Sequence, residues 1–233
     1  MELKKNIRGI ELLLSTDSEA LKMYAEDYEK VEPENFDFID TLKTNDLFLD
    51  LGACEGRYAV YAAKKGIPTI AVEPESKNYD AMCRNISLNN LTNIQTHKIA
   101  VGKYTHSGRI VVGQNNAGGH HKILEDSCSR GSVKNSAAPR QEIEIFALDD
   151  LAWKPTAIKI DVDGSELDAL EGGEKTIRSC QQIIIELYTT DPHYAKCRWL
   201  LQEWGFVDKQ IYQIRFPYVE ADLFNYWLIK PSH

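Results

Sequence analysis

The chain has 233 residues, 43% of them hydrophobic, which is enough to bury the core of one large domain. Its formal net charge of −8 at pH 7, without any block of lysine and arginine, argues against a general nucleic-acid-binding or anionic-membrane surface. The five cysteines include no C-x-x-C pair, and no apolar run approaches membrane-spanning length. We therefore expect a reduced, cytoplasmic chain without a structural zinc site or a membrane span.

The first part of the chain, residues 1–45, is expected to be an N-terminal helical extension of a domain that covers residues 46–233. A capping-box pattern with Thr16 as the N-cap predicts a helix, and apolar residues follow it at helical spacing. Two interpretations stay open for this helix. It packs on the edge of the domain, or it forms a lid with Tyr24 or Tyr28 facing a ligand.

The most informative stretch is residues 48–63, which predicts a buried strand, a glycine turn and a helix. Gly52 permits the turn where a Cβ atom would clash, and Gly56 leaves room at the start of the helix. In the dinucleotide-binding pattern G-x-G-x-x-G the second glycine would stand at position 54, which is Cys54. A pyrophosphate would therefore lack its close approach to the backbone.

The next predicted strand, residues 70–73, ends in Glu73, about 20 residues after the turn, where a ribose-binding carboxylate belongs. A ribose carboxylate without a pyrophosphate turn favours S-adenosylmethionine over NAD or FAD. A third strand is expected at residues 94–101, and its end borders either an adenine pocket or simple sheet core. The candidate cofactor-binding residues are Asp50, Gly52, Ala53, Glu73, Pro74, Ala100 and Asp161.

Residues 103–150 interrupt the regular alternation of strands and helices. Two predicted strands, residues 108–112 and 142–146, flank a long polar segment at 113–140. We interpret this part as a hairpin-like insertion that carries a substrate lid, with surface disorder as the alternative. His120 is a candidate catalytic residue of that lid. Because adjacent side chains point to different sides, His120 and the histidine after it are not expected to share a metal ion.

The second informative stretch begins with a predicted strand at residues 157–160. Asp161 and Asp163 follow it directly, and Glu166 opens the next helix. Ligands in open α/β sheets bind beyond the carboxyl ends of the strands, so these acids are expected near the site. Asp163 and Glu166 would also simply favour a helix N-terminus, whereas Asp161 is harder to explain as surface.

The last part of the chain predicts one more buried strand at residues 183–188, which carries Glu186 near its end, and a helix at 194–204. Two further strands, at residues 206–215 and 221–229, follow. They are expected to pair antiparallel at one edge of the sheet.

Several of these stretches together resemble the FkbM-type methyltransferase family, over roughly residues 45–190. The signature K-I-D-V-E-G-A-E of that family corresponds to KIDVDGSE here, with Asp163 in place of glutamate and Ser165 in place of alanine. Cys54 stands where the family usually has asparagine. The other matching stretches are residues 50–58 (DLGACEGRY), 72–74 (VEP), 85–90, 100–102 (AVG) and 148–151 (LDDL).

This resemblance implies a class I methyltransferase with a Rossmann-like α/β fold and a seven-stranded, mostly parallel sheet. It also implies S-adenosylmethionine as cofactor, S-adenosylhomocysteine as product, and methyl transfer to a hydroxyl oxygen. The acceptor is commonly a sugar, a lipid or a polyketide-like natural product. Neither the acceptor nor the oligomeric state follows from the resemblance.

Methyl transfer is an in-line displacement, and an alcohol acceptor also needs a base within hydrogen-bond reach. Asp161 is the first candidate for the active-site carboxylate; it could instead bind the methionyl amino group and leave the base to the lid. In an alternative form of this mechanism, Asp161 and Glu186 ligate one Mg²⁺, although a metal-free site is favoured. The candidate catalytic residues are Asp161, Asp163, Glu166 and His120.

Three other classes of function are weighed against this one. The glycine pattern disfavours a nucleotide-dependent oxidoreductase, and the acidic composition disfavours an RNA or DNA methyltransferase. A non-catalytic cofactor-binding module is also compatible with the sequence.

Overall fold

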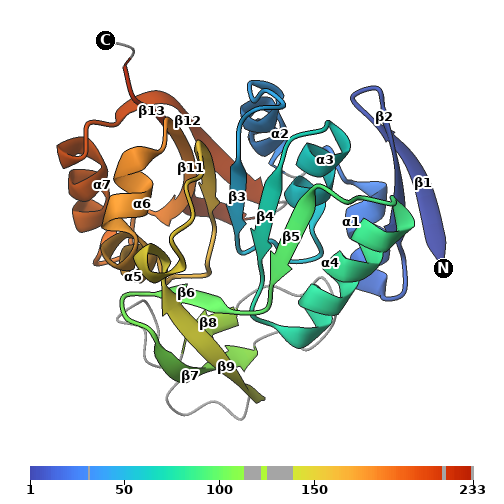
Figure 1. Ribbon diagram of the computed structural model, residues 1–233, viewed down its shortest axis with the longest axis horizontal. Coiled ribbons are helices and arrows are strands. Elements are labelled where there is room, and N and C mark those ends of the chain that lie inside the picture. Colours follow the sequence, from blue (N-terminus) through green and yellow to red (C-terminus); the bar gives the residue numbers. More distant parts are fainter. Residues whose placement is uncertain (31, 113–121, 125–138, 217–218, 232–233) are drawn as a thin grey trace.

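The computed structural model describes residues 1–30, 32–112, 122–124, 139–216 and 219–231. Its centre is a seven-stranded sheet with the strand order β12-β13-β11-β10-β3-β4-β5 (Figure 1). The strands of this sheet are β3 (Phe48–Leu51), β4 (Thr69–Val72), β5 (Ile94–His97), β10 (Ala157–Ile160), β11 (Gln182–Tyr188), β12 (Val207–Phe216) and β13 (Val219–Ile229).

The five strands β11, β10, β3, β4 and β5 run parallel to one another, while β13 runs antiparallel to both β11 and β12. The expected seven-stranded, mostly parallel sheet with a C-terminal antiparallel pair is therefore confirmed. The carboxyl ends of the parallel strands meet at one edge of the sheet, where ligands of such folds bind.

Helices cover both faces of the sheet, because successive residues of each central strand point to opposite faces. Phe48 packs in the apolar cluster below α2 and α3, whereas Leu49 packs in the cluster below α5, α6 and α7. Within the described part of the chain, no helix combines the length and the apolar character needed to cross a lipid bilayer. The helices are α2 (Pro33–Asp40), α3 (Arg57–Lys64), α4 (Ser76–Leu88), α5 (Glu166–Gly172), α6 (Glu174–Ser179) and α7 (Tyr194–Glu203).

The N-terminal extension is only partly helical, which corrects the expectation from the sequence. A hairpin of β1 (Glu2–Ile7) and β2 (Ile10–Ser15) precedes α1 (Glu19–Glu26) and lies beside α1 and α4 in Figure 1. Arg8 and Gly9 form its two-residue turn, with φ of 49° and 84°. Positive φ at both positions matches the twist of the paired strands. The start of α1 is also corrected, because Ser18 and not Thr16 is the N-cap.

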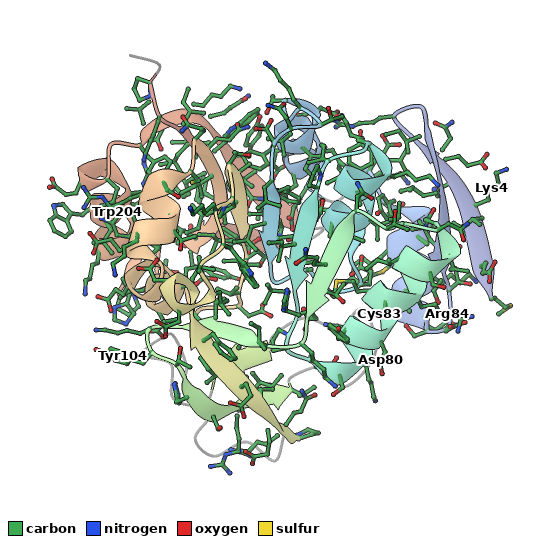
Figure 2. All side chains as sticks on the ribbon, in the orientation of Figure 1. Lys4, Asp80, Cys83, Arg84, Tyr104 and Trp204 are labelled. Carbon is green, nitrogen blue, oxygen red and sulfur yellow. The ribbon has the colours of Figure 1, made fainter. Side chains whose placement is uncertain are left out.

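Side chains of α4 hold this hairpin against the domain. Asn85 accepts a hydrogen bond from the amide of Ser15, at 2.8 Å. Asn89 binds both the amide and the carbonyl of Leu13, at 3.0 and 2.7 Å. Arg84, labelled on α4 in Figure 2, forms an ion pair with Asp17 at 2.8 Å. The two asparagines thus satisfy backbone groups that an unpaired strand edge would otherwise expose.

The insertion forms a second sheet of four strands in the order β6-β9-β7-β8, below the main sheet in Figure 1. The expected hairpin is present as β7 and β9, which pair antiparallel. Most of the predicted lid at residues 113–140, with His120, lies outside the described residues. The strands of this insertion sheet are β6 (Ala100–Gly102), β7 (His106–Val112), β8 (Lys122–Leu124) and β9 (Arg140–Ala147).

Two predicted elements are each divided in the structure. The strand expected at residues 94–101 is β5 followed by β6, which belong to different sheets. The helix expected after Gly164 is α5 followed by α6, which meet at Gly172 and Gly173. A Cβ atom on Gly172 would lie 2.0 Å from the carbonyl oxygen of Gly102, so α5 packs directly on the backbone of β6.

Candidate active site

The glycine turn after β3 lies in direct contact with the end of β10. Gly52 has a φ of 79°, and a Cβ atom there would lie 1.8 Å from the carbonyl oxygen of Asp161. The amides of Gly52 and Ala53 both donate to the carbonyl of Val72, at 3.0 and 2.9 Å. These two candidate cofactor-binding residues therefore form the backbone of the turn, and their amides are already used within the protein.

Glu73 follows β4 directly and is buried, with 4% of its surface exposed. One of its carboxylate oxygens accepts from the amide of Cys54 and the other from the amide of Glu75, both at 2.9 Å. Burial raises the pKa of Glu73 to about 8 against the effect of these bonds, and the nearby charge of Asp163 adds to the rise. Because a carboxylate oxygen accepts more than one hydrogen bond, each oxygen retains capacity for a ribose hydroxyl.

A group of charged residues lies at the carboxyl ends of β3, β10 and β11. Asp50 and Lys159 stand opposite each other in register, and Asp161 and Glu186 follow on the same face of the sheet. The ammonium of Lys159 lies 3.0 Å from Asp161 Oδ2 and 3.7 Å from Asp50 Oδ1. The sequence does not mark Lys159 as a site residue, because a lysine within a strand usually lies on the surface.

The pKa values in this group follow from burial and from these neighbours. Burial alone would lower the pKa of Lys159, but the charges of Asp161 and Asp50 raise it further than burial lowers it. Burial raises the pKa of Asp50 to about 6. Burial, together with the charge of Asp161, raises the pKa of Glu186 well above its ordinary value. Lys159 therefore keeps its positive charge, while Asp50 and Glu186 near it take up a proton more readily than exposed carboxyl groups do.

Glu32, which is not among the candidates predicted from the sequence, extends from the N-terminal segment into this group. One carboxylate oxygen each of Glu32, Asp161 and Glu186 lie within 4.8 Å of one another. Glu32 accepts hydrogen bonds from Asn35 at 2.8 Å and from the hydroxyl of Tyr58 at 3.3 Å. Its backbone has a φ of 48°, an uncommon conformation for a residue with a side chain. No sequence pattern marks a single acid before a helix as a site residue.

The remaining candidates lie elsewhere around the turn. Glu166 accepts from the amides of Val162 and Gly164, at 3.2 and 3.0 Å, and so closes the turn after β10. Burial raises its pKa to about 7. Asp163 has a φ of 51°, and its charge contributes to the raised pKa of Glu73, so it lies on the same side of the turn as Glu73. Ala100 is buried in the apolar cluster of the insertion sheet.

The start of α3 is covered by aromatic residues from the N-terminal segment. The guanidinium of Arg57 lies 4.7 Å from the ring centre of Tyr24 and 5.6 Å from that of Tyr28. Arg57 also forms a buried ion pair with Glu55 at 3.2 Å, and the hydroxyl of Tyr28 donates to its carbonyl. Both tyrosines therefore pack on the beginning of α3, beside the turn.

Comparison with known proteins identifies the family of the part of the chain that carries these residues. A sequence model of the methyltransferase FkbM domain matches residues 50–216, which include the glycine turn, Glu73 and the β10 carboxylates. The chain belongs to the FkbM methyltransferase family. It is an S-adenosylmethionine-dependent methyltransferase, and the resemblance stated from the sequence is confirmed. Methyltransferase 1 from Beauveria bassiana is 22% identical over 176 residues, covering 68% of this chain and 71% of that protein.

Solved structures with the same class I methyltransferase fold are more distant in sequence. Trm5b from Pyrococcus abyssi has a TM-score of 0.54 and 14% identity over 98% of this chain, which spans only 55% of Trm5b. An rRNA methylase from Streptococcus thermophilus has a TM-score of 0.52 and 13% identity, covering 86% of this chain and 95% of that one. TYW2 from M. jannaschii, in complex with AdoMet, has a TM-score of 0.51 and 11% identity, covering 99% and 87%.

Proposed function

We propose that this FkbM-family protein methylates a hydroxyl oxygen of a small molecule, such as a sugar, a lipid or a natural product. The observation that carries the proposal is the position of Asp161. Asp161 directly follows β10, and its carboxylate lies 3.0 Å from the ammonium of Lys159. The backbone carbonyl of the same residue packs against Gly52 of the glycine turn. A base therefore lies beside the turn that is expected to hold the cofactor.

The residues around the turn fit S-adenosylmethionine. Glu73 offers two preorganised carboxylate oxygens to a ribose. Cys54 stands where the dinucleotide-binding pattern has the glycine that a pyrophosphate approaches. The bound cofactor would supply an electrophilic methyl group. The chain would position the acceptor hydroxyl and accept its proton on Asp161, while Lys159 holds the carboxylate in place.

The charge of the site supports an uncharged acceptor over a phosphate-bearing one. Glu32, Asp161 and Glu186 converge at its edge, and the ammonium of Lys159 is already bound to Asp161. Carboxylates repel phosphate groups, whereas they accept hydrogen bonds from hydroxyl groups. Two structural neighbours are named as an rRNA methylase and a putative RNA methyltransferase, but at 13% and 10% identity they share only the fold with this chain.

A metal-assisted reaction is the second candidate, because Glu32 adds a third carboxylate to the pair predicted from the sequence. Mg²⁺ prefers such oxygen ligands and usually keeps several waters. Against this candidate, Lys159 already supplies a positive charge at the same place.

The test is transfer of a labelled methyl group from S-adenosylmethionine to a panel of sugars, phenols and hydroxylated lipids. We expect labelled methyl ethers with the wild type, and a loss of about 10²–10⁴-fold in rate for Asp161→Asn, which cannot accept the proton. Glu174→Gln, an exposed change on α6, serves as the control and should leave the rate unchanged. Label on nitrogen or on RNA, or full activity of Asp161→Asn, would refute O-methylation with Asp161 as base.

The same assay decides between the two candidates. Activity that persists in EDTA supports the metal-free site. Activity that EDTA abolishes and Mg²⁺ restores, with Glu32→Gln weakening the response to Mg²⁺, would establish the metal-assisted reaction instead.

A further inference from the structure

Gln141, the second residue of β9, connects the insertion sheet to the cofactor side of the main domain. Its side-chain oxygen accepts hydrogen bonds from both the amide and the hydroxyl of Ser76, at 3.0 and 2.9 Å. Its side-chain nitrogen donates to the carbonyl of Pro74, at 2.8 Å. These three bonds join two segments that lie more than 60 residues apart in the chain.

The segment that Gln141 holds is the one that shapes the environment of Glu73. Pro74 follows Glu73 directly, and the amide of Glu75 donates to a carboxylate oxygen of Glu73 at 2.9 Å. The side chain of Glu75 accepts from the amide of Asn78, at the start of α4. A displacement of residues 74–76 would therefore remove one of the two backbone donors that orient the proposed ribose carboxylate.

The insertion sheet that carries Gln141 is itself packed against the main domain. At its β6 end, the close approach of Gly172 to the carbonyl of Gly102 locks the sheet against α5. β9 lies next to β6 in that sheet. Gln141 is thus held by a packed element on one side and holds the loop after β4 on the other.

We propose that Gln141 is a positioning residue through which the insertion sheet sets the affinity for the nucleoside half of S-adenosylmethionine. The inference rests on the proposed cofactor site at Glu73. Glutamine suits the role because one side chain must both accept from Ser76 and donate to Pro74. A glutamate at this position would retain the acceptor and lose the donor.

The experiment is calorimetric titration of S-adenosylhomocysteine and 5′-methylthioadenosine into the wild type, Gln141→Ala, Gln141→Glu and Glu142→Ala. Glu142 is the next residue of β9, and its side chain is exposed, so that variant is the matched control. We expect Gln141→Ala to weaken both ligands by the same factor, about tenfold, because the effect lies at the nucleoside half that both share. The affinity of Gln141→Glu should lie between those of the wild type and Gln141→Ala. Glu142→Ala should bind both ligands as tightly as the wild type does.

A general loss of structure is separated from positioning by the pH dependence of 5′-methylthioadenosine binding. If residues 74–76 loosen, Glu73 loses the donor that lowers its pKa, so the midpoint of the binding curve should move to higher pH in Gln141→Ala. Unchanged affinity in Gln141→Ala, equal weakening in Glu142→Ala, or an unmoved midpoint would overturn the inference. Failure of the wild type to bind either ligand would instead refute the cofactor site itself.

Discussion

Glu73 is a buried carboxylate in which desolvation outweighs two backbone hydrogen bonds. The result is a pKa of about 8, so at pH 7 most molecules without a ligand carry the neutral acid. A neutral acid accepts hydrogen bonds from two ribose hydroxyls less well than a carboxylate does. Binding of the nucleoside is therefore expected to release a proton from this residue.

The first prediction follows from that proton. Because the bound form requires the ionised carboxylate, affinity for 5′-methylthioadenosine should increase by about tenfold between pH 7 and pH 9 and then level off. The ligand itself has no group that titrates in this range. Titration calorimetry over the pH series measures the effect, and Glu73→Gln should show weaker binding that does not change with pH. A flat profile for the wild type would contradict the role given to Glu73.

Residues differ in how far the sequence reveals them. Glu73 and Asp161 were predictable because each directly follows a buried strand, where the carboxyl edge of a parallel sheet places its side chains. Glu32 and Gln141 were not, because their positions depend on how the N-terminal segment and the insertion dock onto the domain. Lys159 was hidden for a different reason, since one of the acids that stabilise its ammonium is Asp50 of β3, which stands beside it only through the register of the sheet.

Elements with strong local signals were also predicted well. The strand, glycine turn and helix at residues 48–63 form as expected, as does the C-terminal antiparallel pair. The N-terminal hairpin was missed because it docks on Asn85 of α4 and Asn89 just after it, a contact between segments about 70 residues apart that no local pattern predicts. The division of residues 94–101 was missed for a similar reason, because β6 finds its partner in β9.

The packing of α5 on β6 can be tested at Gly172, where the backbones of the two elements are in contact. In an unobstructed helix, replacing glycine with alanine stabilises by about 0.5–1 kcal/mol. Here the new Cβ atom would lie 2.0 Å from the carbonyl oxygen of Gly102, and we expect Gly172→Ala to lower the free energy of unfolding by about 1–3 kcal/mol. Denaturant unfolding measures this change. Stability equal to or above that of the wild type would show that α5 does not pack so closely on the insertion sheet.

The molecule as a whole combines a net negative charge with a site that gathers carboxylates at one sheet edge. Both features fit an uncharged acceptor, and neither fits a polyanion. The topology separates Glu73, the proposed cofactor carboxylate, from Asp161, the proposed base for the acceptor. Adjacent strands β4, β3 and β10 bring their carboxyl ends together on either side of the glycine turn.

The most direct test of this account is calorimetric titration of S-adenosylmethionine and S-adenosylhomocysteine, with NAD as the control, into the wild type and Glu73→Ala. We predict that both sulfur compounds bind to the wild type, that NAD does not, and that Glu73→Ala weakens binding by about 100-fold through the loss of two charge-assisted hydrogen bonds. Preference for NAD, or the same affinity in Glu73→Ala as in the wild type, would contradict the cofactor site on which the proposed function depends.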